Sequence, residues 1–546
     1  MSLADWIILF LTLTGIIVYG VYKGRSRKSL EGYFLSDRDM PAYLVLFSIM
    51  GTQASAITYL TGPGQSYSDG MRFVQYYFGL PLAMIVICIF FVPVFSRLKV
   101  LTAYEFLEQR FDGRTRSLTS FLFLLSRGLS TGISIYAPSL VLSSLMGWNI
   151  YLTNLVTGGL LIIYTMSGGA RAVAHTQKLQ MLIVFVTLIL VGYLSVRLLP
   201  GEKGFLHALR EAGREGKMNI ITSGETANGF DWKDKYNIWS GLIGGFFLAL
   251  SYFGTDHSQV GRYLTAKSIR ESRLGLLLNG LVKVPMQFFI LLLGILIFSF
   301  YQNQRAPVYF DDTRVNMGLQ TASRDSLMAT EASYHAAQEA GDHQGAAGYR
   351  KQYRAILSRA LPDEDVNDTN YIFLRFVREN LPAGLIGIIF AIIFLSAWGS
   401  IAAALNSLAA CTMVDFHKRY FEPKDKPMHE YRVSQWYTLG WGVFCIVISM
   451  FAHNIGNSLI EAVNILGSLF YGVILGIFLV AFWIDKIRAR AVFIAALLSE
   501  AIVIAIYKAD VISFLWLNAI GAISVIVLGT MIQLALRVLP VKTTSG

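Results

Sequence analysis

Long uncharged apolar runs recur along the whole chain of 546 residues. Two of them, residues 148–168 and 179–196, are each about long enough to cross a hydrocarbon core of ~30 Å as a helix of about 20 residues. Apolar residues make up 54% of the sequence and charged residues only 15%, whereas soluble domains carry roughly 25% charged residues. The chain is therefore predicted to be an all-α polytopic membrane protein rather than a soluble globule.

Apolar windows predict about thirteen transmembrane helices. We expect the first to be retained rather than cleaved, because no basic segment precedes it and no small-residue cleavage site follows it. The thirteen windows lie near residues 4–22, 42–66, 75–97, 117–145, 149–167, 173–199, 237–257, 274–301, 382–414, 433–453, 457–484, 491–508 and 511–536.

Basic residues are concentrated in alternate short loops between these windows. Cytoplasmic loops are enriched in Lys and Arg, so the N-terminus is predicted outside and the C-terminus in the cytoplasm. The formal charge of +11 then reflects topology and contact with an anionic inner leaflet, and no nucleic-acid partner is expected. We predict a multi-pass protein of a cell membrane, with a bacterial inner membrane favoured. The basic loops lie at residues 23–28, 97–116, 171–178, 262–273, 418–432 and 486–490.

Two longer segments of mixed charge, residues 200–236 and 302–381, are predicted to lie outside the membrane on the outer side. Within the second, residues 323–361 are rich in Ala, Glu, Gln, Arg and Lys, which favour helices. We therefore expect one or two polar helices there, with a hairpin broken at Gly341 as one arrangement.

Small polar residues at membrane depth are the strongest pointers to a site. They cluster in residues 51–58 and residues 396–407, and in the first cluster a Gly-Pro-Gly sequence follows at residues 62–64. A short or broken helix there would offer free carbonyls and hydroxyls to a cation or solute, because irregular backbone is tolerated in a membrane only where it faces protein or water. The same small residues equally suit close helix packing.

The chain lacks the short motifs of common enzyme classes. It contains no His-Glu-x-x-His metal motif, glycine-rich phosphate loop, nucleophile elbow or Cys-x-x-Cys. We therefore do not expect an enzyme, and no obligate protein partner is predicted. A transporter or a membrane sensor fits the architecture better.

Four segments together resemble one family. The sequence at residues 254–267, Gly-Thr-Asp-His-Ser-Gln-Val-Gly-Arg-Tyr-Leu-Thr-Ala-Lys, is similar to a signature of the solute:sodium symporters, which include the sodium/glucose and sodium/sialic acid transporters. Residues 51–67, residues 164–169 and residues 405–407 with Asp415 agree with it. The resemblance extends over residues 4–490 in consistent order.

The resemblance implies a core of two inverted five-helix repeats and sodium-driven uptake by alternating access. The first repeat would cover residues 42–199 and the second residues 237–484, interrupted by the outer insertion 302–381. Residues 4–22 and 491–536 would be extra helices at the two ends, and residues 200–236 an outer loop between the repeats.

The resemblance also implies one sodium site. Its ligands would be the carbonyls of Gly51, Ala54 and Ser396 and the hydroxyl of Ser400. The serines of an additional site in sialic acid transporters align with alanines at 402–403, so at most one sodium ion is expected.

Two departures from the family pattern lie near this site. Gly399 replaces one hydroxyl ligand, and the sequence Gln177-Lys178 stands where a carboxylate is usual beside the cation route. A lost carboxylate weakens cation binding in a medium of low dielectric constant, and a nearby ammonium group could take part of the role of the cation. Gln177 and Lys178 are therefore the coupling candidates.

The expected solute contacts differ from those of galactose transporters. The polar sugar ligands of the family align with Gln53, Thr58, Tyr77, Ala249 and Leu281, so most of those hydrogen bonds are lost.

Sialic acid transporters offer a closer pattern. Ser55 and Thr58 match their carboxylate-binding hydroxyls, and Tyr252 matches an aromatic gate. Arg127 lies about one turn from the position of their arginine and is a candidate partner for a carboxylate, although an arginine near a helix end can also snorkel. Asn464 suits either the pocket or helix packing.

These observations predict a sodium-coupled symporter for a small organic solute, with carboxylates such as sugar acids or monocarboxylates favoured over neutral sugars. One alternative is a proton-coupled or sodium-independent transporter of the same fold. The other is a transporter-like membrane sensor, which the absence of an attached signalling domain disfavours.

Overall fold

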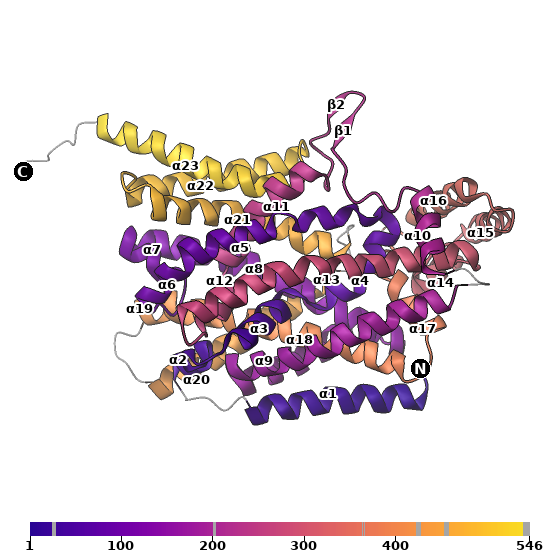
Figure 1. Ribbon diagram of the computed structural model, residues 1–546, viewed down its shortest axis with the longest axis horizontal. Coiled ribbons are helices and arrows are strands. Elements are labelled where there is room, and N and C mark those ends of the chain that lie inside the picture. Colours follow the sequence, from indigo (N-terminus) through magenta and orange to yellow (C-terminus); the bar gives the residue numbers. More distant parts are fainter. Residues whose placement is uncertain are drawn as a thin grey trace, which may run out of the picture.

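The computed structural model describes residues 1–23, 29–199, 204–362, 364, 366–421, 427–452 and 458–538. The described chain forms one elongated bundle of helices (Figure 1). The basic residues at 24–28 and 422–426, which the topology prediction used, lie outside the described residues.

Helices dominate both halves of the bundle. The helices up to the first outer segment are α1 (Leu3–Lys23), α2 (Leu30–Leu35), α3 (Ala42–Gln53), α4 (Ala56–Asp69), α5 (Leu80–Val86), α6 (Val92–Leu98), α7 (Glu105–Arg110), α8 (Gly113–Met146) and α9 (Ile150–Arg197). Those from the second half of the bundle are α11 (Gly245–Gly254), α12 (His257–Leu264), α13 (Ile269–Asn303), α18 (Leu385–Cys411), α19 (Lys418–Tyr420), α20 (Pro427–Ser449), α21 (Leu459–Trp483), α22 (Ala489–Ala509) and α23 (Phe514–Val538). Short 3-10 or π-helical turns join several of them: η1 (Ser36–Arg38), η2 (Met71–Tyr77), η3 (Ile87–Phe91), η4 (Ser240–Gly244) and η5 (Thr412–His417).

Local capping fixes the ends of the long helices. The Asp112 carboxylate accepts a hydrogen bond from the Thr115 amide at the start of α8, and Ser268 accepts one from the Glu271 amide at the start of α13. Gly147, with φ of +68°, ends α8 in the left-handed conformation that glycine adopts without strain.

The structure confirms an all-α membrane fold but not the count of thirteen spans. Nine helices in the described part of the chain are long and apolar enough to cross a membrane, and α3 with α4 forms a tenth span bent by 60°. Two shorter apolar helices cover Ile150–Met166 and Ser240–Gly254. Helix α20 overlaps the predicted window 433–453 but is not among the helices apolar enough to qualify.

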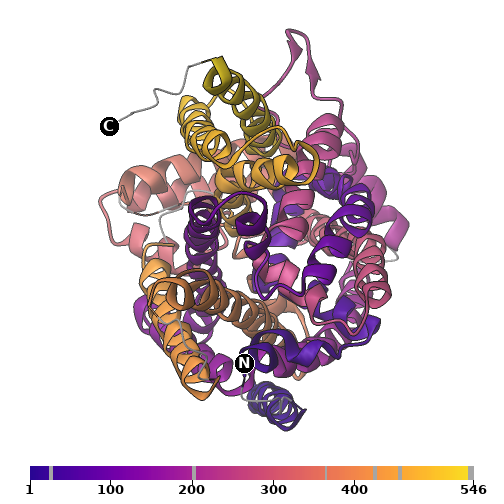
Figure 2. The same ribbon diagram turned by 90° about the vertical axis from the view of Figure 1, so that its left-hand side faces the viewer.

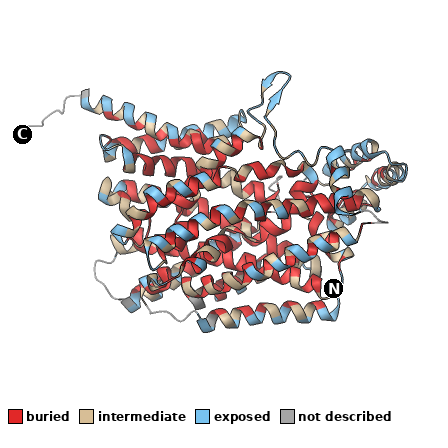
Figure 3. Cartoon of the chain, in the orientation of Figure 1, coloured by how far each residue is buried: buried red, intermediate tan, exposed pale blue. Residues whose placement is uncertain are grey.

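Helix α18 lies at the centre of the packing, and its residues Ala397 to Ala404 are all buried. In contrast, α1 and the pair α22–α23 lie on opposite edges of the bundle, where much of their surface is exposed (Figures 1, 2 and 3). The functional elements are therefore those around α18.

The segment 204–236 forms a helix and a small hairpin, α10 (Phe205–Arg214) with β1 (Glu225–Thr226) and β2 (Gly229–Phe230). The segment 302–381 forms α14 (Asp312–Leu319), α15 (Arg324–Glu339), α16 (His343–Ala360) and α17 (Ile372–Asn380). Helices α15 and α16 turn at Gly341, whose φ is +71°, which confirms the predicted polar hairpin.

The outer insertion is held to the bundle by a buried charge cluster. The Asp368 carboxylate pairs with Arg350 at 3.1 Å and with Arg354, and the Arg350 guanidinium lies 5.6 Å from the ring centroid of Tyr67 on α4. Burial alone would raise the pKa of Asp368, but Arg350 and Arg354 outweigh it and hold the pKa below its ordinary value. The charged carboxylate therefore fastens α16 close to the outer half of α4.

Candidate functional site

Helices α3 and α4 are separated by a break at Ala54 and Ser55. The Ser55 amide donates to the Gln53 carbonyl at 3.1 Å, and the Thr58 amide donates to the Ser55 carbonyl at 3.0 Å. In a continuous helix these two amides would bond to the carbonyls of Gly51 and Ala54, four residues earlier. The break therefore releases two of the carbonyls that the sequence predicted as cation ligands.

The hydroxyl of Ser400 lies close to this break. Ser400 lines a small cavity of about 70 Å³ together with Thr52 and Ser55, and its Oγ donates to the Ala397 carbonyl at 3.1 Å. Ser396, one turn earlier on α18, is fully buried, and its Oγ has no hydrogen-bond partner among the described residues. Carbonyl and hydroxyl oxygens of α3, the break and α18 are thus available to a hard cation.

Gln177 joins the two helices that carry these oxygens. Its Oε1 accepts from Ser48 Oγ at 3.0 Å, and its Nε2 donates to Thr52 Oγ1 at 3.2 Å and to the Gly399 carbonyl at 3.1 Å. A side chain at Gly51 would overlap the Gln177 side chain, so glycine is needed for this close approach. A neutral amide thus bridges α3, α9 and α18 at the position where the family pattern has a carboxylate.

Lys178, the other coupling candidate, points elsewhere. Its Nζ lies 5.3 Å from the ring centroid of Tyr43, a residue that is 50% exposed. The structure therefore brings only Gln177 to the break, and it puts Lys178 against a surface aromatic ring.

A central cavity of about 110 Å³ adjoins the break. Its walls come from α3, α4, η2, α8, α11 and α21, and it shares wall residues with the smaller cavity at Ser400. All seven residues that the sequence predicted as solute contacts lie on it, namely Gln53, Ser55, Thr58, Tyr77, Arg127, Tyr252 and Asn464.

Arg127 is the charged group of this cavity. It is 9% exposed, its Cζ lies 5.7 Å from the ring centroid of Tyr252, and its Nη1 lies 3.9 Å from Asp256 Oδ2. That separation is too long for a hydrogen bond, and Arg127 Nε has no hydrogen-bond partner among the described residues. Asp256 instead accepts from Tyr471 Oη at 2.8 Å and from the Ser258 amide at 2.7 Å.

Two neutral groups on the cavity wall also have unused hydrogen-bonding capacity. Asn464 Oδ1 accepts from Tyr76 Oη at 3.2 Å, but Asn464 Nδ2 has no partner among the described residues, and neither has Gln53 Oε1. The cavity therefore offers two donors, from Arg127 and Asn464, and one acceptor, from Gln53, to a bound molecule.

One buried charge was missed by the sequence reasoning. Leu281, which aligns with a sugar-binding lysine of the family, is 66% exposed and faces away from the interior. Two residues later, Lys283 is 1% exposed, and its Nζ lies 5.7 Å from the ring centroid of Tyr77. A lysine on a mostly apolar helix was the available signal, since such residues usually face the interior of a bundle.

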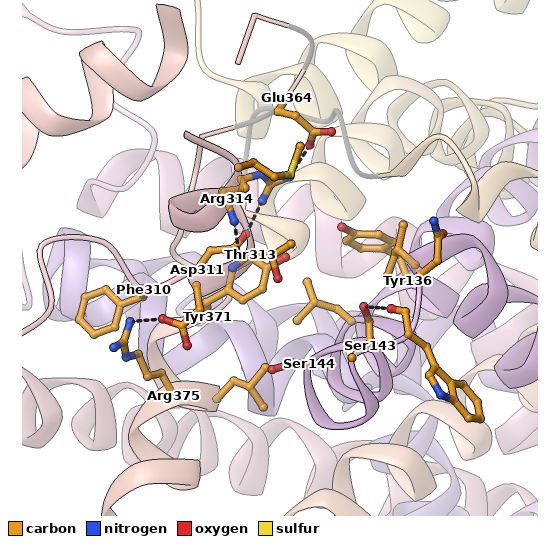
Figure 4. Close-up of a pocket in the computed structure, with 18 of the residues that line it drawn as sticks. Tyr136, Ser143, Ser144, Phe310, Asp311, Thr313, Arg314, Glu364, Tyr371 and Arg375 are labelled. Atoms are coloured by element: carbon orange, nitrogen blue, oxygen red, sulfur yellow. Dashed lines mark hydrogen bonds and ion pairs between the residues drawn. The ribbon is translucent and has the colours of Figure 1, made fainter. Parts of the chain in front are cut away.

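A larger cavity of about 560 Å³ lies at the outer end of the bundle, between α14, α17 and the turn from α8 to α9 (Figure 4). Its charged groups are paired with one another: Arg314 contacts Asp311 and Glu364, and Arg375 contacts Asp312. These pairs join residues of the insertion to one another, so its charges are already balanced, and the central cavity is the better candidate for solute binding.

A sequence profile described as the sodium:solute symporter family matches residues 33–317 and 349–499. The gap between the two matched stretches contains α15 and the first residues of α16. The profile thus covers most of the bundle and all of the residues around the central cavity.

Individual relatives agree with this profile. The chain is 24% identical over 530 residues to the sodium/sialic acid symporter SiaT of Proteus mirabilis, which covers 96% of this chain and 94% of the relative. It is 25% identical over 476 residues to the sodium-coupled monocarboxylate transporter 1 of Xenopus laevis, which covers 86% of this chain and 66% of the relative.

The fold is also similar to a solved structure. The substrate-bound outward-open state of a Na⁺-coupled sialic acid symporter aligns with a TM-score of 0.78 at 22% identity, covering 98% of both chains. This likeness confirms the transporter fold that the sequence predicted.

Proposed function

The chain belongs to the sodium:solute symporter family, and we propose that it couples the entry of one sodium ion to the uptake of a small carboxylate-bearing solute by alternating access. The N-terminus would lie outside and the C-terminus in the cytoplasm. The start of α1 and the end of α23 lie at opposite ends of the bundle, which supports placing the two termini on opposite sides of the membrane (Figure 1).

The broken helix supports the sodium part of the proposal. The carbonyls of Gly51 and Ala54 are released from helical hydrogen bonds, and the Ser400 hydroxyl of α18 lies close to them. The Ser396 carbonyl, one turn earlier on α18, would be the fourth ligand. These four oxygens suit a hard monovalent cation, which binds oxygen ligands in preference to nitrogen or sulfur. A bound sodium ion would supply a positive charge beside the solute cavity.

Arg127 is the observation that carries the solute part. A buried guanidinium that lacks a full set of acceptors is stabilised by a carboxylate, which can accept two hydrogen bonds from it. Asn464 Nδ2 and the hydroxyls of Ser55 and Thr58 would hold the remaining solute oxygens. Neutral sugars leave the charge of Arg127 without this additional partner.

The size of the cavity favours the smaller carboxylates. Sites for drug-sized ligands usually measure about 300–1,000 Å³, whereas this cavity measures about 110 Å³. A short monocarboxylate or hydroxy acid fits this volume better than a nine-carbon sugar acid does. We therefore favour monocarboxylates within the carboxylate class.

Uptake by purified protein in proteoliposomes tests the proposal. We expect an inward sodium gradient to drive accumulation of short monocarboxylates, with little uptake of neutral sugars. Vesicles without a sodium gradient are the control. Accumulation of neutral sugars alone would overturn the carboxylate assignment, and binding without accumulation would favour a sensor.

Proton coupling is a second candidate, favoured by one observation. The amide of Gln177 is saturated with hydrogen bonds to Ser48, Thr52 and Gly399 and carries no charge to attract a cation. Uptake that follows a proton gradient in the absence of sodium would support this candidate.

A further inference from the structure

Three polar side chains form a buried stripe on α13. Asn279, Lys283 and Gln287 are spaced four residues apart, so they lie on one face of the helix. Their exposed fractions are 0%, 1% and 0%. The stripe lies at membrane depth, on a helix that is otherwise mostly apolar.

The stripe lacks hydrogen-bond partners. The amide nitrogen and the amide oxygen of the Asn279 side chain are buried without a hydrogen-bond partner among the described residues, and so are those of Gln287. Polar groups in such a position cost free energy unless water or a ligand reaches them at some stage. The stripe is therefore suited to a part of the protein that becomes wetted when the transporter opens.

Lys283 stands in the middle of this stripe without a counter-charge. Its contact is the Tyr77 ring, and none of the ion pairs among the described residues includes it. Burial of the charged ammonium group costs desolvation free energy, and no carboxylate offsets that cost. Release of the proton makes the group neutral and removes most of the cost.

The neighbouring elements do not supply the missing charge. Asp69, the acid on α4, pairs with Arg72 at 2.8 Å near the outer end of that helix. Arg262 and His257 on α12 are basic and cannot neutralise an ammonium group. Helix α9 also packs against α13, and it carries no acid. The ionisable side chains on the elements packed around the middle of α13 are Tyr43 on α3, Tyr59, Tyr67 and Asp69 on α4, Arg72, Tyr76 and Tyr77 on η2, Tyr151, Tyr164, Arg171, His175, Lys178, Tyr193 and Arg197 on α9, and His257, Arg262 and Tyr263 on α12, and α5 has none.

Tyr77 links Lys283 to the solute cavity. The Tyr77 side chain lines that cavity, and its ring also lies next to the Lys283 ammonium group. A carboxylate bound in the cavity would therefore lie one aromatic ring away from Lys283 and would favour its protonated form. By linkage, protonation of Lys283 would favour binding of the carboxylate equally.

We propose that Lys283 binds and releases a proton during the transport cycle, so that carboxylate uptake is coupled to proton entry. This inference rests on the proposed carboxylate transport. On the outer side the Lys283 amine takes a proton from a hydronium ion: an N–H bond forms, the O–H bond breaks, and its electron pair stays on the oxygen of the water released. On the inner side the N–H bond breaks, the electron pair stays on Nζ, and the proton passes to water.

Two substitutions imitate the two protonation states. Lys283→Arg keeps a positive charge that does not dissociate in the usual pH range, and Lys283→Gln removes the charge. Lys178→Arg and Lys178→Gln are the matched controls, because Lys178 lies against the exposed Tyr43 ring. Uptake of a short monocarboxylate is measured in proteoliposomes from pH 5.5 to 8.5 at fixed sodium.

We expect wild-type uptake and both Lys178 controls to change about tenfold over this range, and both Lys283 variants to give a flattened profile. Calorimetry of monocarboxylate binding in buffers of different ionisation enthalpy should detect proton uptake by the wild type and none by the Lys283 variants. The proposal is overturned if both Lys283 variants keep the pH profile of the wild type and still take up a proton on binding.

A third measurement needs no solute. The difference in unfolding temperature between wild type and Lys283→Gln should vary between pH 5 and 9 if Lys283 titrates, and the corresponding difference for Lys178→Gln should be nearly constant. A constant difference for Lys283→Gln overturns proton exchange at Lys283. If the difference for Lys283→Gln does vary with pH but no carboxylate binds, the proposed solute class is wrong and Lys283 is still shown to titrate.

Discussion

Two of the broken helices in the described part of the bundle differ in how their breaks are filled. At the break between α3 and α4, the carbonyls of Gly51 and Ala54 lose their helical amides, and no charged side chain lies in the break itself. At the break between α11 and α12, Asp256 caps α12, and Tyr104 Oη donates to the Thr255 carbonyl at 3.0 Å. The first break leaves carbonyl oxygens without helical hydrogen bonds. At the second break, side chains of the protein already bond to the free backbone groups.

This difference suits the two breaks to different ligands. Free carbonyls with partial negative charge suit a cation, while the fixed carboxylate of Asp256 partly balances Arg127 and so adjusts the affinity of the cavity for an anion. Under the proposed function, these two similar breaks would therefore serve ligands of opposite charge. Substitutions at each break should then affect the sodium dependence and the solute dependence of uptake separately.

The largest effect is expected at Arg127 of α8, which lies beside Asp256 of the second break. Arg127→Gln should lower kcat/KM for a monocarboxylate at least about 30-fold, because loss of a charge-assisted pair costs about 2–5 kcal/mol. The sodium dependence should change little. Uptake kinetics at saturating sodium measure this.

A double variant controls for misfolding. Arg127→Gln alone leaves the Asp256 carboxylate buried without its cation, whereas Arg127→Gln with Asp256→Asn removes both charges. The double variant should recover thermal stability but not uptake. Recovery of uptake would show that Arg127 serves the fold rather than the solute.

A smaller effect in the opposite direction is expected at the first break. Gln177→Asp places a carboxylate near the released carbonyls and should lower the sodium concentration for half-maximal uptake about tenfold, equivalent to about 1.4 kcal/mol. Gln177→Asn is the neutral control of the same length. Equal sodium dependence in the two variants would contradict a cation site beside Gln177.

Ser400→Ala should raise the sodium concentration for half-maximal uptake about fivefold, since it removes one oxygen worth about 1 kcal/mol. Ser407→Ala is a matched control on the same helix, because the Ser407 hydroxyl likewise donates to its own helix, at the Ala403 carbonyl. If both variants behave as wild type in sodium titrations, Ser400 is not a ligand.

The smallest effect is expected for Lys178→Gln, with a change of less than about twofold in either sodium or solute dependence. Lys178 contacts Tyr43 at the surface, and surface contacts of this kind contribute little. A large change in sodium titrations would restore Lys178 as a coupling residue.

Much of this architecture follows from the sequence. Apolar runs of about 20 residues indicate membrane helices because hydrocarbon excludes charge, and the polar composition of residues 323–361 indicates α15 and α16. The family resemblance brought together seven residues from separate helices, which periodicity alone cannot do. The number of spans was harder to predict, because α20 carries too many polar residues for its length.

Side-chain direction limited the prediction of the site. Lys178 and Gln177 are neighbours in sequence, yet a step of about 100° around α9 sends one to the surface and the other to the break. The same geometry applies to Leu281 and Lys283, whose two-residue separation turns them to nearly opposite faces of α13. The position that the resemblance pointed to, Leu281, therefore faces outward, and the buried lysine stands two residues further along.

The hairpin of α15 and α16 lies at the edge of the outer end of the bundle, and much of it falls in the stretch between the two family-matched segments. Much of its outer surface is exposed, and the turn at Gly341 has open space around it. A peptide tag or fluorescent reporter inserted at this turn would leave α3, α18 and the cavity untouched. The hairpin thus offers a handle for labelling, antibody capture and image alignment of a transporter that is otherwise largely embedded in lipid.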